Sequence, residues 1–173
     1  MTTDSEVNHR HPEELTIRSA LSHYSPADNV SHEHQSMFSR AFAKIEEVLG
    51  LKGDDFMSAS EMKDAHDEFY LHGGDTEAKT TVSIDRIGNF IAAAAAAEAG
   101  YAFERHASLQ KFDENEKKSL DFMVGFSMAE AIKLFEQLNN RHATNEEREQ
   151  IAASAGAHAK AFYSQSFAHP AQA

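Results

Sequence analysis

The amino-acid sequence predicts an all-α protein, a single-domain bundle of about six helices. Three observations predict it: apolar residues recur every three or four positions, capping signals precede these stretches, and no stretch alternates apolar and polar residues as a strand does. The chain has 173 residues, the length of one domain with a sizeable core. We expect that core to be built on a long antiparallel hairpin of residues 84–111 and 114–141.

Two helices are predicted before residue 50. Pro12 suits a first helical turn and is followed by two glutamates, so it begins a helix over residues 12–23. Ser25 is an N-cap for the next helix, over residues 26–49. Gly50 and Gly53 are expected to break this second helix, because glycine is a poor helix former.

A short helix is predicted between two clear signals. Ser58 and Glu61 have the spacing of a capping box, and the Gly73–Gly74 pair ends the helix. Polar residues at steps of three and four form one face of it: Glu61, Asp64, Glu68 and His72. Carboxylates and an imidazole arranged in this way could hold a divalent cation, although a solvated helix face has the same pattern.

Three further helices are predicted in the second half of the chain. The apolar spacing indicates long helices over residues 84–111 and 114–141, joined by a very short turn. A capping box at Thr144 and Glu147 begins the last helix, over residues 144–166.

Small residues mark one side of the 84–111 helix. Six consecutive alanines, residues 92–97, are flanked by Gly88 and Gly100. Such a narrow face lets a second helix approach closely, so we expect it to pack within the chain. A dimer interface across a two-fold axis and a ligand cavity beside the small residues are the alternatives.

Two histidines and two glutamates are candidates for a site in the bundle interior. His106 and His158 fall on the apolar sides of their helices, and Glu98 and Glu130 interrupt otherwise apolar or small-residue faces. A buried imidazole could be a haem ligand, a proton acceptor or a pH switch, and burial raises the pKa of a carboxyl group. The common alternative is a core histidine bonded to a carbonyl, with each glutamate at the solvent seam.

Composition limits both the partners and the location of the protein. Lys and Arg number 16 against 28 Asp and Glu, a formal charge of −12, so nucleic-acid binding is disfavoured. The chain has no cysteine, which excludes disulfides and thiolate chemistry and fits a reducing compartment. With no membrane span and no Sec signal pattern, we expect a cytoplasmic protein.

We further expect a disordered arm over residues 1–11, a helical domain over residues 12–167 and a frayed tail over residues 168–173.

No motif in the sequence names a reaction, and no cofactor can be assigned from it. The preferred interpretation is a non-enzymatic helical binding or regulatory protein that recognises a protein partner, as a homodimer. The alternative is a bundle that binds a small ligand, haem or a metal ion, with histidines and carboxylates of its interior, and that could be an enzyme. A secreted effector is a third interpretation, suggested only by the polar start of the chain.

Overall fold

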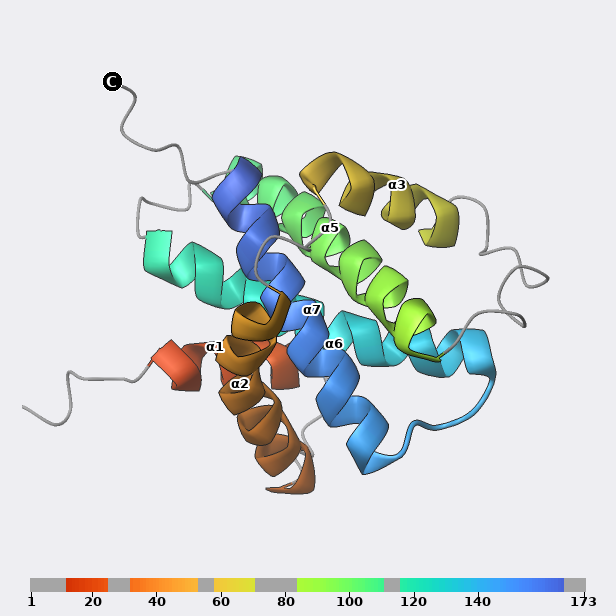
Figure 1. The fold of residues 1–173 in the computed structure, drawn as a ribbon. Helices are drawn as coiled ribbons and strands as arrows, with labels where there is room; N and C mark the ends of the chain where they lie inside the picture. The colour runs from red at the N-terminus through yellow and green to blue at the C-terminus, as the bar shows by residue number, and fades with distance from the viewer. Residues whose placement is uncertain (1–11, 25–31, 53–57, 71–83, 111–115, 167–173) are drawn as a thin grey trace, which may run out of the picture.

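The computed structural model describes residues 12–24, 32–52, 58–70, 84–110 and 116–166, in which every regular element is a helix (Figure 1). The helices are α1 (Pro12–Tyr24), α2 (His32–Lys52), α3 (Ala59–Tyr70), α5 (Ile84–Gln110), α6 (Glu116–Asn139) and α7 (Asn145–Ser166). The predicted all-α fold is therefore confirmed. Within the described part of the chain, no helix is both long and apolar enough to cross a membrane.

Helices α5, α6 and α7 form the middle of the bundle. In Figure 1, α5 and α7 run side by side and α6 passes behind them, and these three helices pack against one another. Helix α1 covers α6, helix α2 covers α7, and α3 lies along the outer side of α5. Helix α6 packs against α1 and α7 as well as against α5, so its contacts do not single out the α5–α6 pair. That the core is built on a long hairpin of these two helices therefore stays a prediction.

The alanine run is buried inside the chain. Residues 92–97 each have 0% relative exposure. Close to them, a Cβ added at Gly100 would lie 2.5 Å from Cε1 of Phe162 on α7, so α7 approaches where the side chains are smallest. This face is covered by the protein's own helices, as the packing interpretation predicted, so it is not open for a dimer contact.

Among the described glycines, Gly125 on α6 is the one that lies against the backbone of another helix. An added Cβ there would lie 2.3 Å from the carbonyl oxygen of Thr16 and 2.9 Å from the backbone nitrogen of Ala20, both on α1. Next to this contact, the Ser19 hydroxyl donates a hydrogen bond to the carbonyl oxygen of Phe122 at 3.1 Å. Only glycine allows two helix backbones to lie this close.

The predicted capping box at Thr144 and Glu147 is complete, and at Ser58 the side-chain cap is present without the return bond from Glu61 to the Ser58 N–H. Ser58 Oγ accepts a hydrogen bond from the Glu61 backbone N–H at 3.2 Å. Thr144 Oγ1 accepts one from the Glu147 N–H at 3.2 Å, and Glu147 Oε1 accepts one from the Thr144 N–H at 3.0 Å. At its C-terminus, α6 is followed by Asn140, whose φ of 51° is left-handed, as is common for the residue after a helix.

One predicted helix end was wrong, and several other predictions fall outside the described residues. Helix α2 continues through Gly50 to Lys52, because an exposed glycine weakens a helix by only about 1 kcal/mol and does not stop it. The predicted cap at Ser25, the break at Gly53, the Gly73–Gly74 helix end, the arm and the tail are not among the described residues.

Candidate functional site

The two interior glutamates that the sequence singled out are the centres of a polar network. Glu130, on α6, is half-buried and bonds to side chains of two other helices. His23 Nε2 on α1 lies 2.5 Å from Glu130 Oε2, and the Tyr70 hydroxyl at the end of α3 donates to Glu130 Oε1 at 2.6 Å. One carboxylate thus connects α1, α3 and α6.

The second glutamate, Glu98 on α5, binds another histidine. His66 Nε2 on α3 lies 2.5 Å from Glu98 Oε2, and Arg105 Nη2 donates to Glu98 Oε1 at 3.0 Å. The His66 ring stacks on the Tyr70 ring, with centroids 4.5 Å apart and an interplanar angle of 17°. This stack joins the two pairs into one group, the His–Glu network, formed by His23, His66, Tyr70, Glu98 and Glu130.

The network keeps Glu130 ionised and Tyr70 protonated. Burial raises the pKa of Glu130, but hydrogen bonds from His23 and Tyr70 outweigh it, so the pKa lies below its usual value. Burial, and then the charge of Glu130, raises the pKa of the Tyr70 hydroxyl far above its usual value. The arrangement can hold protons in fixed positions and tie outer helices to α5 and α6, and its polar groups satisfy one another.

The histidine predicted on α7 has the common structural role. His158 is 1% exposed, and its Nδ1 lies 2.7 Å from the carbonyl oxygen of Ser154, one turn earlier. Glu98 bonds instead to side chains of α3 and α5, so the structure does not bring His158 and Glu98 together. The side chain of His106 lies outside the described residues.

The predicted metal face on α3 has the carboxylates in the expected place but shows no metal geometry. Glu61, Asp64 and Glu68 are exposed, and Glu61 accepts a hydrogen bond from its capping partner Ser58. Across the described ranges, no three His, Asp or Glu side chains are grouped so that they could hold a metal ion. His72 lies outside the described residues, so the four-residue set stays a prediction.

Sequence reasoning did not single out His23, His66 and Tyr70 as site residues. A signal existed for α3: His66 falls four residues after the apolar Met62 and four before Tyr70, on the side that proves to be buried. Nothing in the sequence could link these residues to glutamates on other helices.

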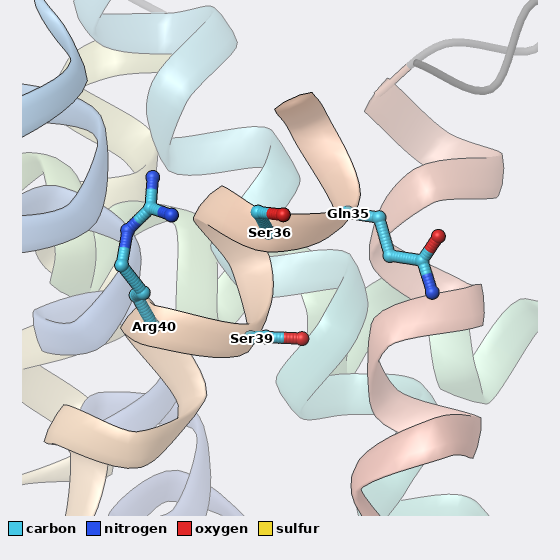
Figure 2. A pocket seen from close by; sticks show the side chains of 4 residues that line it. All are labelled: Gln35, Ser36, Ser39 and Arg40. Carbon is cyan, nitrogen blue, oxygen red and sulfur yellow. The ribbon is translucent and has the colours of Figure 1, made fainter. Parts of the chain in front are cut away.

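A shallow depression of about 520 Å³ lies on α2, lined by Gln35, Ser36, Ser39 and Arg40. Figure 2 shows that its two long side chains diverge, with Gln35 extending toward α1 and Arg40 toward the opposite side. Arg40 is already bonded to Glu149 of α7. The depression is open and its polar groups do not converge, so it lacks the features of a ligand site.

The outer surface of α3 and the adjoining part of α5 carry exposed carboxylates. This acidic face consists of Glu61, Asp64, Asp67, Glu68 and Glu104. Asp67 and Glu104 act on the same phenol, because their charges both raise the pKa of Tyr101 on α5, after the larger effect of burial. The α3 and α5 parts of the acidic face therefore meet around Tyr101.

No protein-family model, curated protein or solved structure matches this chain.

Proposed function

We propose that the protein is a non-enzymatic helical binding protein, and that it recognises a positively charged protein partner through the acidic face. One observation carries the proposal: in the described part of the chain, the carboxylates of this face form no ion pair with Lys or Arg. Among the described side chains of α3 and α5, the cations are Lys63, which lies over the Phe162 ring, and Arg105, which is bonded to Glu98. The face therefore keeps an excess of negative charge.

The contrast with the α2–α7 seam supports this proposal. There, Glu149 is bonded by both Arg40 and Lys44, and Glu46 is paired with Lys160 at 2.7 Å. Glu46 and Glu149 are thus neutralised within the chain by Lys and Arg, whereas the described carboxylates of the acidic face have no such partner. An uncompensated face steers an oppositely charged partner and selects against the wrong ones.

Tyr101 adds a specific feature to the acidic face. Its ring is half-buried and makes a T-shaped contact with the His66 ring at a centroid distance of 4.8 Å. A tyrosine ring beside carboxylates suits an arginine, because a guanidinium group can stack on the ring while it donates to the acids. The proposed partner is therefore a protein with an arginine-rich or lysine-rich surface segment.

Two charge-reversal variants test the proposal. Asp64→Lys/Glu68→Lys changes the acidic face, and Glu46→Lys/Glu47→Lys makes the same change in net charge on α2. Each variant and the parent protein are immobilised and used to capture proteins from cell extract at about 0.05 M and about 0.5 M salt. At low salt, we expect the parent and the α2 variant to capture the same basic proteins. The α3 variant should no longer capture them. Equal capture by both variants would refute the acidic face as the recognition surface.

The alternative of a small-ligand, haem or metal-binding bundle gains no support from the interior geometry. The carboxylates of Glu98 and Glu130, which such a site would use, are bonded to His23, His66 and Tyr70. Absorbance and metal analysis of the untagged protein as purified test this alternative. One metal ion or chromophore per chain would favour it over the binding protein.

Two finer parts of the proposal concern assembly and location. A homodimer would need a surface other than the alanine run, because residues 92–97 are covered within the chain. The mass of the protein in solution tests the dimer. A cytoplasmic location is supported by the absence of cysteine, and fractionation of the source cells tests it.

A further inference from the structure

Tyr101 is an aromatic side chain within the acidic face, and the His–Glu network holds the ring that it contacts. Its own ring makes a T-shaped contact with His66, at a centroid distance of 4.8 Å and an interplanar angle of 69°. His66 is in turn bonded to Glu98 and stacked on Tyr70. Because Tyr101 is only half-buried, this contact holds the ring and leaves part of it at the surface.

Two exposed carboxylates from different helices lie near this ring. Glu104 is on α5, three residues after Tyr101, where side chains of one helix are neighbours. Asp67 is on α3, and its Oδ1 lies 3.4 Å from Nδ1 of the same His66 ring that contacts Tyr101. Burial, and then the charges of Asp67 and Glu104, raise the pKa of the Tyr101 hydroxyl, as expected for carboxylates close to it. A group that lies on Tyr101 is therefore close to an acceptor from each helix.

The chain already places one arginine along this part of α5. Arg105 Nη2 donates a hydrogen bond to Glu98 Oε1 at 3.0 Å, and the Arg105 side chain is 62% exposed. Tyr101 lies between them on the helix, three positions after Glu98 and four before Arg105, so the three residues share one face. This surface thus accommodates a guanidinium group. Arg105 uses Glu98 and leaves Asp67 and Glu104 without a Lys or Arg partner in the described part of the chain.

No described cation of the chain lies over the Tyr101 ring. Lys63 lies over the ring of Phe162, at 5.9 Å from its centroid, and Arg141 lies over the ring of Phe135, at 5.3 Å. The described cations that do contact rings are therefore directed elsewhere. Tyr101 keeps its exposed part for a cation from outside the chain.

We propose that Tyr101, Asp67 and Glu104 form an arginine site, which binds one guanidinium group of the partner in preference to a lysine ammonium group. The inference rests on the proposed function and names the residue type that anchors the partner. A planar guanidinium stacks on the ring while its N–H groups, which point outward in its plane, donate to the two carboxylates. A lysine ammonium is a compact, strongly hydrated charge and gains less from the ring.

The other carboxylates of the acidic face attract both kinds of cation. Glu61, Asp64 and Glu68 are exposed on α3, and their charges act alike on arginine and on lysine. Binding of either cation therefore reports on the acidic face, whereas a preference for arginine reports on the arginine site.

Two peptides of equal charge separate these contributions: hexa-arginine and hexa-lysine, both acetylated, amidated and labelled with the same fluorophore. Their dissociation constants for the full chain are measured by fluorescence anisotropy at about 0.05 M salt, where surface charges are weakly screened. We expect hexa-arginine to bind the parent about threefold more tightly, as for an exposed cation–π contact. Equal affinities would overturn the arginine site.

Three substitutions assign the preference to the ring. Tyr101→Leu keeps the charge of the face and an apolar side chain, so the two peptides should bind it with nearly equal affinity. Tyr101→Phe keeps a ring that can stack, so the preference should remain. Phe90→Leu is the matched control, because it removes a 44% exposed ring about three turns earlier on α5, and it should bind as the parent does. A Tyr101→Leu protein with the full preference would overturn the proposal.

A measurement on the parent protein covers the case in which Tyr101→Leu does not fold. The NMR signals of the Tyr101 ring protons are followed as each peptide is added. At equal saturation, we expect hexa-arginine to shift these signals more than hexa-lysine does. Equal shifts with the two peptides would contradict stacking on this ring.

The same peptides distinguish failure of the arginine site from failure of the proposed function. If the parent binds both peptides equally and Asp64→Lys/Glu68→Lys binds neither, the acidic face is a recognition surface and the arginine site is wrong. If the parent binds neither peptide, both proposals are wrong.

Discussion

Replacing Gly125 by alanine should destabilise the protein, even though alanine is the better helix former. The added Cβ would lie 2.3 Å from the Thr16 carbonyl oxygen, 2.7 Å from Ser19 Cβ and 2.9 Å from the Ala20 nitrogen. The first distance is about 1 Å short of ordinary van der Waals contact. Two of these three atoms belong to the backbone of α1, so relief requires movement of the whole helix.

The expected change in the free energy of unfolding is the balance of overpacking and a weakened hydrogen bond against the better helix propensity of alanine. Overpacking costs about 1–3 kcal/mol, and a displaced α1 weakens the Ser19–Phe122 hydrogen bond, worth about 1 kcal/mol. The helix propensity of alanine returns about 1 kcal/mol at Gly125. We therefore expect a net loss of about 1–3 kcal/mol in the free energy of unfolding, or a fall in Tm of about 2–10 °C for a chain of this length.

Gly50→Ala is the matched control. An added Cβ there meets nothing within 4 Å, so only the propensity term acts, and stability should rise by up to about 1 kcal/mol. Gly156→Ala should fall between the two variants, because its Cβ would meet the Cδ1 end of the flexible Ile45 side chain at 2.4 Å.

Urea unfolding followed by circular dichroism measures all three variants, and the midpoints are compared at constant slope. Hydrogen exchange should place the loss of protection in Gly125→Ala on α1. A Gly125→Ala protein that is as stable as Gly50→Ala would refute the close packing of α1 on α6.

Three further predictions concern other parts of the bundle. Ala95→Leu, at a fully buried position, should cost about 1–3 kcal/mol in urea unfolding and leave the mass in solution unchanged; a changed mass would contradict the burial of this face within the chain. Tyr70→Phe removes a donor to Glu130, so the pKa of the Glu130 carboxyl should rise towards its usual range in an NMR titration; an unchanged value would disprove that contact. Hydrogen bonds from Arg141 and from the Thr144 N–H lower the pKa of Glu147 from 4.5 to about 2, so the stability it contributes is complete above its ordinary pKa and is lost as the pH falls toward 2. Glu147→Gln should lose less stability over that acid range in urea unfolding, and a loss equal to the parent's would count against the ion pair.

The helices and their ends could be predicted because their causes are local. The capping boxes at Ser58 and Thr144 involve residues three apart, and the His158–Ser154 contact spans one helical turn. The burial of the alanine run could also be predicted, because a stripe of small residues allows another helix to pack closely against it. The prediction that Gly50 breaks the helix was wrong because one glycine destabilises a helix by only about 1 kcal/mol, and α2 continues past it to Lys52.

Of the candidate site, the sequence predicted the two glutamates but not the side chains that bind them. Glu98 and Glu130 stood out because each carboxylate interrupts an apolar face of its own helix, which is a property of the local sequence. Their partners lie 32, 60 and 107 positions away along the chain, at His66, Tyr70 and His23. No periodicity within one helix contains that information.

The sequence by itself thus determined which segments are helical, where most of them end and which faces are apolar, since hydrogen bonds and side-chain spacing within one helix decide these features. The tertiary structure alone decided which helices meet, that α1 contacts the backbone of α6 at Gly125, and that two histidines of the outer helices bind the two interior glutamates. The physical reason is that these contacts depend on the relative placement of whole helices, which the burial of all their apolar faces together determines.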